Sequence, residues 1–112
     1  MSKRSNACEF SAKERKIIYE RDKVCIFCSM GYEPSVHQGF YLGVAHLVPR
    51  SNGGLGIKEN GVLACQYHHE MMDNGNRGKR EEMQGIVRDY LENFYPGFTD
   101  KERIYNKWSF LG

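Results

Sequence analysis

The first regular pattern of apolar and polar residues in this chain is that of a capped helix. Ser11 and Glu14 stand three residues apart, as in a helix-capping box. The apolar residues Ile17 and Ile18 follow at helical spacing. The pattern therefore predicts a helix over residues 12 to 22.

A longer amphipathic pattern occupies residues 79 to 95, and Pro96 ends it. Its apolar stripe consists of Met83, Ile86, Val87, Tyr90, Leu91 and Phe94. Beyond it, Thr99 is a candidate N-cap for a last helix. That helix would run through Ile104, Tyr105 and Trp108, which with Phe110 form an apolar cluster. We expect this cluster to pack in the core, and binding of a partner is the alternative.

The middle of the chain carries shorter patterns. Residues 40 to 45 and 61 to 64 are strand candidates, rich in β-branched, aromatic and other apolar residues. Residues 66 to 74 predict a short helix that Gly75 ends. The glycine-rich stretch from 51 to 56 shows no periodicity and predicts a loop between the strands.

Length and composition limit the protein to a single small domain over residues 1 to 112, with room for a modest core. The sequence has no signal-peptide pattern and no apolar run long enough to cross a membrane. We therefore expect a cytoplasmic protein without a membrane partner, as a monomer or weak dimer. A domain of this size often needs a covalent or metal staple.

The net charge of +2 is unevenly distributed. Residues 1 to 24 contain seven Lys and Arg against four acids, residues 25 to 76 contain two against four, and residues 77 to 112 contain seven against six. An acidic centre between basic flanks suits a site that binds a cation and a polyanion together. Ordinary solvated charge on helix surfaces is the alternative for most of these side chains.

Four residues have the spacing of a structural zinc site: Cys25 and Cys28 form a CxxC pair, and Cys65 and His68 stand three apart at the start of a helix. Thiolates and imidazole suit tetrahedral Zn²⁺. The alternatives are disulfides, a redox-active CxxC, or cysteines that are simply buried. Cys8 has no partner in this pattern and is interpreted as a bystander.

A second group of residues has the character of a chemical centre. His69 and Asp73 lie one helical turn apart, which makes a half-site for Mg²⁺, Mn²⁺ or another divalent metal. His46 ends one strand candidate and could accept a proton from water. Asn60 precedes the other strand and could hold the turn through backbone hydrogen bonds.

The order of these residues resembles the HNH nuclease family, whose pattern is CxxC, then His followed by Pro and Gly-Gly, then Asn, then Cys-x-x-Cys-His. The matching residues here are Cys25, Cys28, His46, Pro49, Gly53, Gly54, Asn60, Cys65, His68 and His69. The resemblance covers residues 23 to 77, about half of the chain. It implies a ββα-metal core over these residues. With the helices predicted from the patterns on either side, the expected fold is α+β, with an N-terminal helix region over 1 to 22 and C-terminal helices over 78 to 112.

The resemblance also implies a function, namely metal-dependent hydrolysis of DNA phosphodiester bonds, by nicking or cutting double-stranded DNA. His46 would be the general base, Asn60 would order the loop, and His69 with Asp73 would bind the catalytic metal. Zinc would be structural only. Small members of the family are frequent in bacteriophages, which implies a bacterial host cell and makes phage DNA-packaging proteins candidate partners.

The candidate DNA-binding cations are Arg50, Arg77, Lys79 and Arg80. Arg50 follows the proposed base closely, and the other three precede the long helix, where backbone N–H groups also favour phosphate. The alternative is a solvated helix start.

One position departs from the family pattern. Many members carry a metal-binding acid or His immediately before the base, and this chain has Ala45 there. The alternative function is therefore a catalytically weak or inactive zinc module that binds DNA or a protein partner.

Overall fold

The computed structural model describes residues 3–34, 42–75 and 78–106 of the chain. Two antiparallel strands lie at its centre, β1 (Leu42–His46) and β2 (Gly61–Cys65). Both strand predictions are close to the observed bounds, although the expected start at residue 40 lies outside the described residues. The register pairs Val44 with Leu63 and His46 with Gly61, so His46 lies at the sheet's end.

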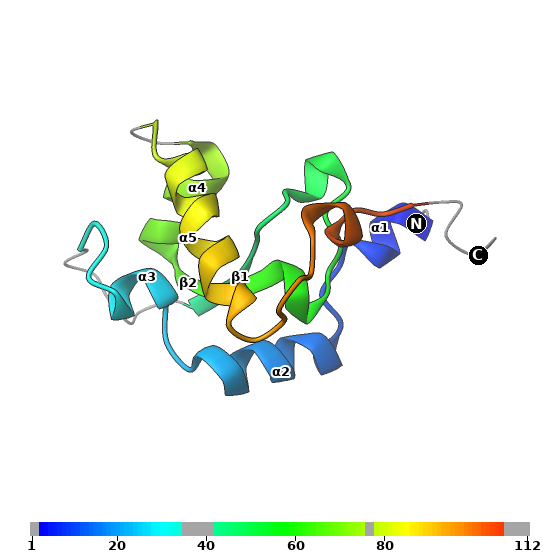
Figure 1. Cartoon of the computed structure of the whole chain (residues 1–112), viewed down its shortest axis with the longest axis horizontal. Helices are drawn as coiled ribbons and strands as arrows, with labels where there is room; N and C mark the ends of the chain where they lie inside the picture. Colours follow the sequence, from blue (N-terminus) through cyan, green and yellow to red (C-terminus); the bar gives the residue numbers. More distant parts are fainter. Residues whose placement is uncertain (1–2, 35–41, 76–77, 107–112) are drawn as a thin grey trace.

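Every residue of β2 is buried, because helices cover both faces of the sheet. Side chains alternate between faces along a strand. Val44 and Leu63 pack against Ile18 of α2 (Ala12–Asp22), and Ala45 and Val62 belong to the larger core on the opposite face. In Figure 1, α2 lies below the strands, and the helices α4 (Gln66–Asn74) and α5 (Arg80–Glu92) lie above them.

The helices predicted over 12 to 22 and 66 to 74 are confirmed with the expected bounds. Ser11 Oγ accepts a hydrogen bond from Glu14 N at 3.2 Å, as expected for the N-cap. The Glu14 carboxylate, however, accepts from Lys58 N at 2.9 Å and so connects α2 to the loop before β2. Gly75 ends α4 with a φ of 67°, a left-handed conformation that suits glycine.

Helix α5 is shorter than the predicted range of 79 to 95. It begins at Arg80, and after Glu92 the chain turns, with Tyr95 N donating to Leu91 O at 2.8 Å. Two short helices, α1 (Lys3–Ala7) and α3 (Ile26–Ser29), also precede the strands in the chain. The chain therefore forms a small α+β fold with a two-stranded sheet.

The predicted last helix through Ile104 and Tyr105 is wrong. Thr99 does form a capping box with Glu102, but it begins only the 3₁₀ turn η4 (Asp100–Arg103). Ile104 then bridges to Gly54, and Tyr105 N donates to Gly53 O at 2.7 Å. Ile104 is 39% exposed, so the expected core packing is wrong for it as well. Trp108 and Phe110 lie outside the described residues.

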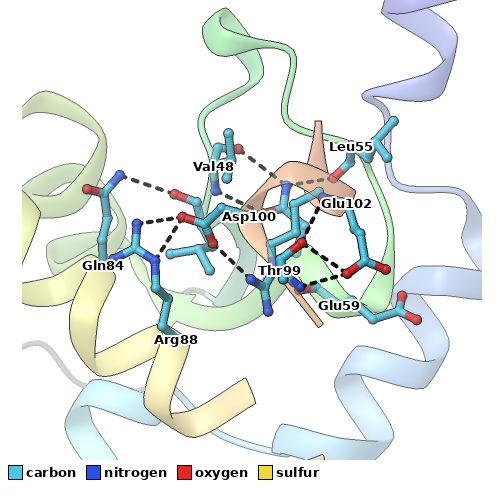
Figure 2. Close-up of polar contacts among 11 residues, drawn as sticks. Val48, Leu55, Glu59, Gln84, Arg88, Thr99, Asp100 and Glu102 are labelled. Atoms are coloured by element: carbon cyan, nitrogen blue, oxygen red, sulfur yellow. Dashed lines mark hydrogen bonds and ion pairs between the residues drawn. The ribbon is translucent and has the colours of Figure 1, made fainter. Parts of the chain in front are cut away.

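A polar network holds the 3₁₀ turn against α5 and the loop before β2. Asp100 accepts hydrogen bonds from Arg88 and from the buried Arg103, both at 2.9 Å, and Arg103 Nε donates to Glu59 O at 2.6 Å. Figure 2 shows these contacts between α5 and η4. Arginine forms several directed hydrogen bonds at once, which allows its burial here.

Candidate metal centre and adjoining cleft

The first component of the site is a knuckle of chain between α2 and α3. Cys25 is the N-cap residue of α3, and its sulfur accepts a hydrogen bond from Cys28 N at 3.4 Å. This turn places both sulfurs on the same side of the knuckle. Cys65 ends β2 and His68 lies in the first turn of α4, so strand and helix supply the other two groups.

The four side chains converge. Their ligand atoms all lie within 4.8 Å of one another. Cys28 Sγ lies 3.7 Å from Cys65 Sγ, and His68 Nδ1 lies 3.5 Å from both Cys25 Sγ and Cys28 Sγ. A tetrahedral zinc ion places two sulfurs about 3.8 Å apart and sulfur and nitrogen about 3.5 Å apart. Cys25, Cys28, Cys65 and His68 can therefore hold a metal ion such as zinc.

The orientation of His68 supports the same conclusion. Its Nε2 lies 2.7 Å from Tyr32 O and 3.0 Å from Glu33 O. Carbonyl oxygens only accept hydrogen bonds, so Nε2 carries the proton and Nδ1 presents its lone pair toward the sulfurs. A backbone acceptor behind the ring is the usual support of a metal-binding histidine.

The cysteines of this centre are free. Burial is the main cause that raises the pKa of the Cys28 thiol to about 12, and the neighbouring Cys25 and Cys65 raise it further. A divalent cation opposes this effect because it stabilises thiolates, so metal binding at this centre would release protons.

A cleft of about 370 Å³ is lined in part by residues of α4, the helix that also carries His68. It is lined by His46, Pro49, Arg50, Ser51, Asn52, Met72, Asp73, Arg80 and Gln84. Two of these, His46 and Asp73, were expected in the chemical centre, and Arg50 and Arg80 were expected as DNA-binding cations. Asp73 also lines a second hollow of about 380 Å³ together with His69. A base candidate from β1 and an acid from α4 thus line the same cleft.

His69 and Asp73 are in direct contact, with His69 Nε2 2.9 Å from Asp73 Oδ2. Both are partly exposed, with side chains 24% and 53% accessible. Within residues 3–34, 42–75 and 78–106, only the Cys25–His68 centre brings three or more metal-ligating groups together. The His69–Asp73 pair therefore has no third metal-ligating group beside it among these residues, and Ala45, fully buried in the core, offers none.

His46 is held by the N-terminal segment. Its Nε2 lies 2.9 Å from Cys8 O, and the ring of Phe10 packs on it with centroids 4.5 Å apart. Because Cys8 O is an acceptor, Nε2 carries the proton and Nδ1 keeps its lone pair. Cys8 is thus a contact of the candidate base rather than a bystander.

The pKa of His46 lies below its usual value of 6.5. Desolvation by burial is the largest cause, and Arg50 and His69 act in the same direction. The Cys8 carbonyl and Asp73 raise the pKa but do not outweigh burial. The imidazole is therefore neutral near pH 7 and able to accept a proton.

Asn60 is fully buried and connects both ends of the loop between the strands. Its Oδ1 accepts from Val48 N at 2.9 Å, and its Nδ2 donates to Val48 O at 3.3 Å and Leu55 O at 2.8 Å. Val48 and Leu55 can be seen on either side of this contact in Figure 2. A Cβ on Gly54 would lie 1.7 Å from Val48 O, so the loop is too tight there for any other residue.

The candidate DNA-binding cations are placed differently from one another. Arg50 lines the cleft and pairs with Glu9 at 2.6 Å. Arg80 also lines the cleft, but its Nε donates to Met72 O at 2.9 Å and its Nη2 donates to Asp73 O, so it caps the C-terminus of α4. Lys79 pairs with Glu33 at 3.4 Å. Arg77 lies outside the described residues.

Sequence reasoning missed one residue that lines the cleft and another that packs on His46. Gln84 of α5 lines it and donates to Leu47 O at 3.2 Å, next to His46. Phe10 was missed as well, although its place immediately before the N-cap Ser11 is a position where apolar residues often pack. That signal predicts burial of Phe10, but it does not indicate contact with His46.

Comparison of this chain with protein-family models, with curated proteins and with solved structures found no match. No helix among the described residues is long and apolar enough to cross a membrane. The fold and the site together define a small α+β domain with a centre of three cysteines and one histidine that can hold a metal.

Proposed function

We propose that this protein is a metal-dependent endonuclease of the HNH type that hydrolyses DNA phosphodiester bonds. The observation that carries the proposal is the shared cleft: His46 and Asp73 line it from two different elements, with Arg50 beside them. A base, a metal-binding acid and a phosphate-binding cation are the parts that phosphodiester hydrolysis requires.

His46 would act through Nδ1. Nε2 is engaged with Cys8 O, which fixes the tautomer and leaves Nδ1 as the acceptor. His46 would take a proton from a water molecule as the water oxygen attacks phosphorus. The bond from phosphorus to the leaving oxygen breaks in the same step, and the phosphate charge faces Arg50.

His69 and Asp73 would hold the catalytic divalent metal. Neighbouring ligands on an octahedral Mg²⁺ lie about 3.0 Å apart, and the 2.9 Å between His69 Nε2 and Asp73 Oδ2 is compatible with this. Mg²⁺ keeps several waters, so two protein ligands and a substrate phosphate suffice. The metal would stabilise negative charge on the phosphate and the leaving oxygen.

Zinc at the cysteine–histidine centre would serve the site by orienting α4. His68 and His69 are adjacent on this helix, so their side chains project about 100° apart. Anchoring His68 to the zinc therefore directs His69 toward the solvent side of α4. The zinc would be structural and take no part in the chemical step.

The test is plasmid cleavage by zinc-loaded protein with Mg²⁺ or Mn²⁺. His46→Ala should reduce the cleavage rate about 10² to 10⁴ fold, the usual contribution of a general base. Lys13→Ala, an exposed residue of α2 outside the cleft, is the control and should cleave like wild type. Wild-type cleavage no faster than that of His46→Ala, in either metal, would refute the proposal.

A second candidate function is a non-enzymatic zinc module that binds DNA or a protein partner. It is favoured by Ala45, which is fully buried and provides no third ligand. Metal-independent DNA binding without cleavage by wild type would support this second function. Isothermal titration calorimetry of Mn²⁺ binding to wild type and to Asp73→Ala separates the two functions. The nuclease requires weaker Mn²⁺ binding by the variant, whereas the zinc module requires no difference in Mn²⁺ affinity.

A further inference from the structure

Two further hollows adjoin the cleft at the loop of residues 49–53. The first, of about 410 Å³, shares Arg50 with the cleft and adds Arg4 of α1. The second, of about 520 Å³, shares Arg4 with the first and adds Lys101 of η4 and Tyr105. Each hollow shares lining residues with the next, so the three are neighbours, and they are described below as one groove whose outer part is the two further hollows.

The outer part of this groove is positively charged. Its charged lining residues in the described part of the chain are Arg4, Arg50 and Lys101, without an Asp or Glu among them. Arg50 pairs with Glu9, but both side chains are 46% exposed, and a surface pair of this kind contributes little free energy, so it is a weak competitor for a phosphate. The cleft proper contains Asp73, so the charge becomes more positive with distance from it.

The cations come from segments that are far apart in the chain and are brought together by the fold. Arg4 Nη2 donates to Ser51 O at 3.1 Å, which holds the guanidinium at the groove wall. The pairing of Ile104 with Gly54 brings η4 to the other side of the same loop. In Figure 1, α1 and the 3₁₀ turn near residues 100–103 lie at the same end of the molecule.

We propose that this outer groove binds the phosphate backbone of the DNA that flanks the cleavage position, with Arg4 and Lys101 as its phosphate contacts. The proposal rests on the proposed nuclease function and extends its substrate contact beyond the cleft. A row of cations along a groove matches the regularly spaced charges of a nucleic acid backbone. Tyr105 offers an aromatic face beside them, which suits a sugar or base of the flank.

The experiment measures DNA binding without cleavage. Fluorescence anisotropy follows a labelled duplex of about 20 base pairs with zinc-loaded protein and no added Mg²⁺ or Mn²⁺, over a series of salt concentrations. The variants are Arg4→Gln, which keeps a donor for Ser51 O, Lys101→Ala, and the two combined. Lys13→Ala with Lys16→Ala, two exposed cations of α2, is the control of equal charge.

The combined variant should bind about tenfold more weakly at 0.1 M salt, and the slope of log affinity against log salt should become shallower by about 1.8, for two lost phosphate contacts. The control should stay within about twofold of wild type, because its lysines lie outside the groove. Thermal unfolding of each variant verifies that the fold is retained.

The proposal is overturned if the combined variant keeps the affinity and salt slope of the control. It is also overturned if polyglutamate of equal charge binds wild type as tightly as the duplex does and is weakened equally by the variants. That result would assign the groove to acidic proteins. A wild-type protein that binds DNA through Arg4 and Lys101 but never cleaves it refutes the nuclease function and leaves the groove intact.

Discussion

At the scale of single residues, His46 is subject to opposing effects on its proton affinity. Burial lowers its pKa, while the Cys8 carbonyl and Asp73 raise it, and burial prevails. A folded-state pKa below 6.5 means that the unfolded chain binds the proton more readily. This contribution to stability is therefore present above pH 6.5 and is lost as pH falls through the folded pKa.

The same shift predicts the pH profile of cleavage. Because protonated imidazole cannot act as a base, kcat/KM should fall on the acid side, with a single-proton limb centred below pH 6.5. Cleavage kinetics over about pH 5 to 8 measure this limb, and circular dichroism at each pH verifies that the protein is folded. A limb centred above pH 7 would contradict the assignment of His46 as the base.

Asn60 provides a second prediction for a single side chain. Asn60→Ala leaves the buried Val48 N–H without its acceptor and removes the donor for Leu55 O. The free energy of unfolding should fall by about 1–3 kcal/mol, the range for an unsatisfied buried polar group. Urea denaturation measures it. The exposed Asn93→Ala serves as control and should change stability by less than about 0.5 kcal/mol.

At the scale of secondary-structure elements, one acid connects three of them. Asp22 ends α2, accepts from Leu63 N of β2 at 2.9 Å, and accepts from Tyr90 OH of α5 at 2.7 Å. It also pairs with Arg21 at 2.6 Å, and both side chains are nearly inaccessible. Arg21 in turn donates to Gly61 O at 2.6 Å, so the pair connects the end of α2 to the first half of β2.

Asp22→Ala is therefore predicted to be strongly destabilising. The substitution leaves the Arg21 charge buried without its partner, which costs about 3–5 kcal/mol in comparable pairs. Urea or thermal denaturation measures the loss. Asp89→Ala, an exposed acid of α5, is the matched control and should lie near wild type. Equal stability of the two variants would mean that the buried pair contributes nothing net.

Secondary-structure elements were predictable from the sequence where their signals are local, and not where a distant contact determines them. The helices over 12 to 22 and 66 to 74 were predictable because their caps and periodicity are local. The zinc-type spacing was predictable for the same reason. The helix expected after Thr99 failed because Ile104 pairs with Gly54, fifty positions earlier in the sequence (104 minus 54). No local pattern contains that contact.

The unpredicted parts of the candidate site share one physical property. Cys8 acts through its backbone carbonyl, which every residue possesses, so its side chain carries no signal. Gln84 and Arg4 contact carbonyls of Leu47 and Ser51, and such pairings are determined only when the chain has folded. The sequence thus indicated which groups have metal and base chemistry, and folding determined which groups hold them in position.

At the scale of the whole molecule, the cysteine–histidine centre stands at the junction of α3, β2 and α4. Cys25 and Cys65 also belong to the main core, together with Met83, Val87 and Leu91 of α5. Structural zinc sites contribute about 10–16 kcal/mol in peptides, and the entire stability of a small domain is about 5–15 kcal/mol. A zinc ion held here would therefore decide whether the chain folds at all.

Removal of the metal is accordingly predicted to unfold the protein. The purified chain should contain one zinc per molecule by elemental analysis, and a strong chelator should abolish the cooperative thermal transition seen by circular dichroism. Cys28→Ala should behave like the chelated protein, because the substitution removes one of the four zinc ligands. Cys8→Ala is the matched control: it removes a buried cysteine that lies outside the centre, so zinc and the transition should be retained. A chelated protein that melts within a few degrees of the untreated one would show that the core is sufficient by itself, and the role of the centre in orienting α4 would have to be abandoned.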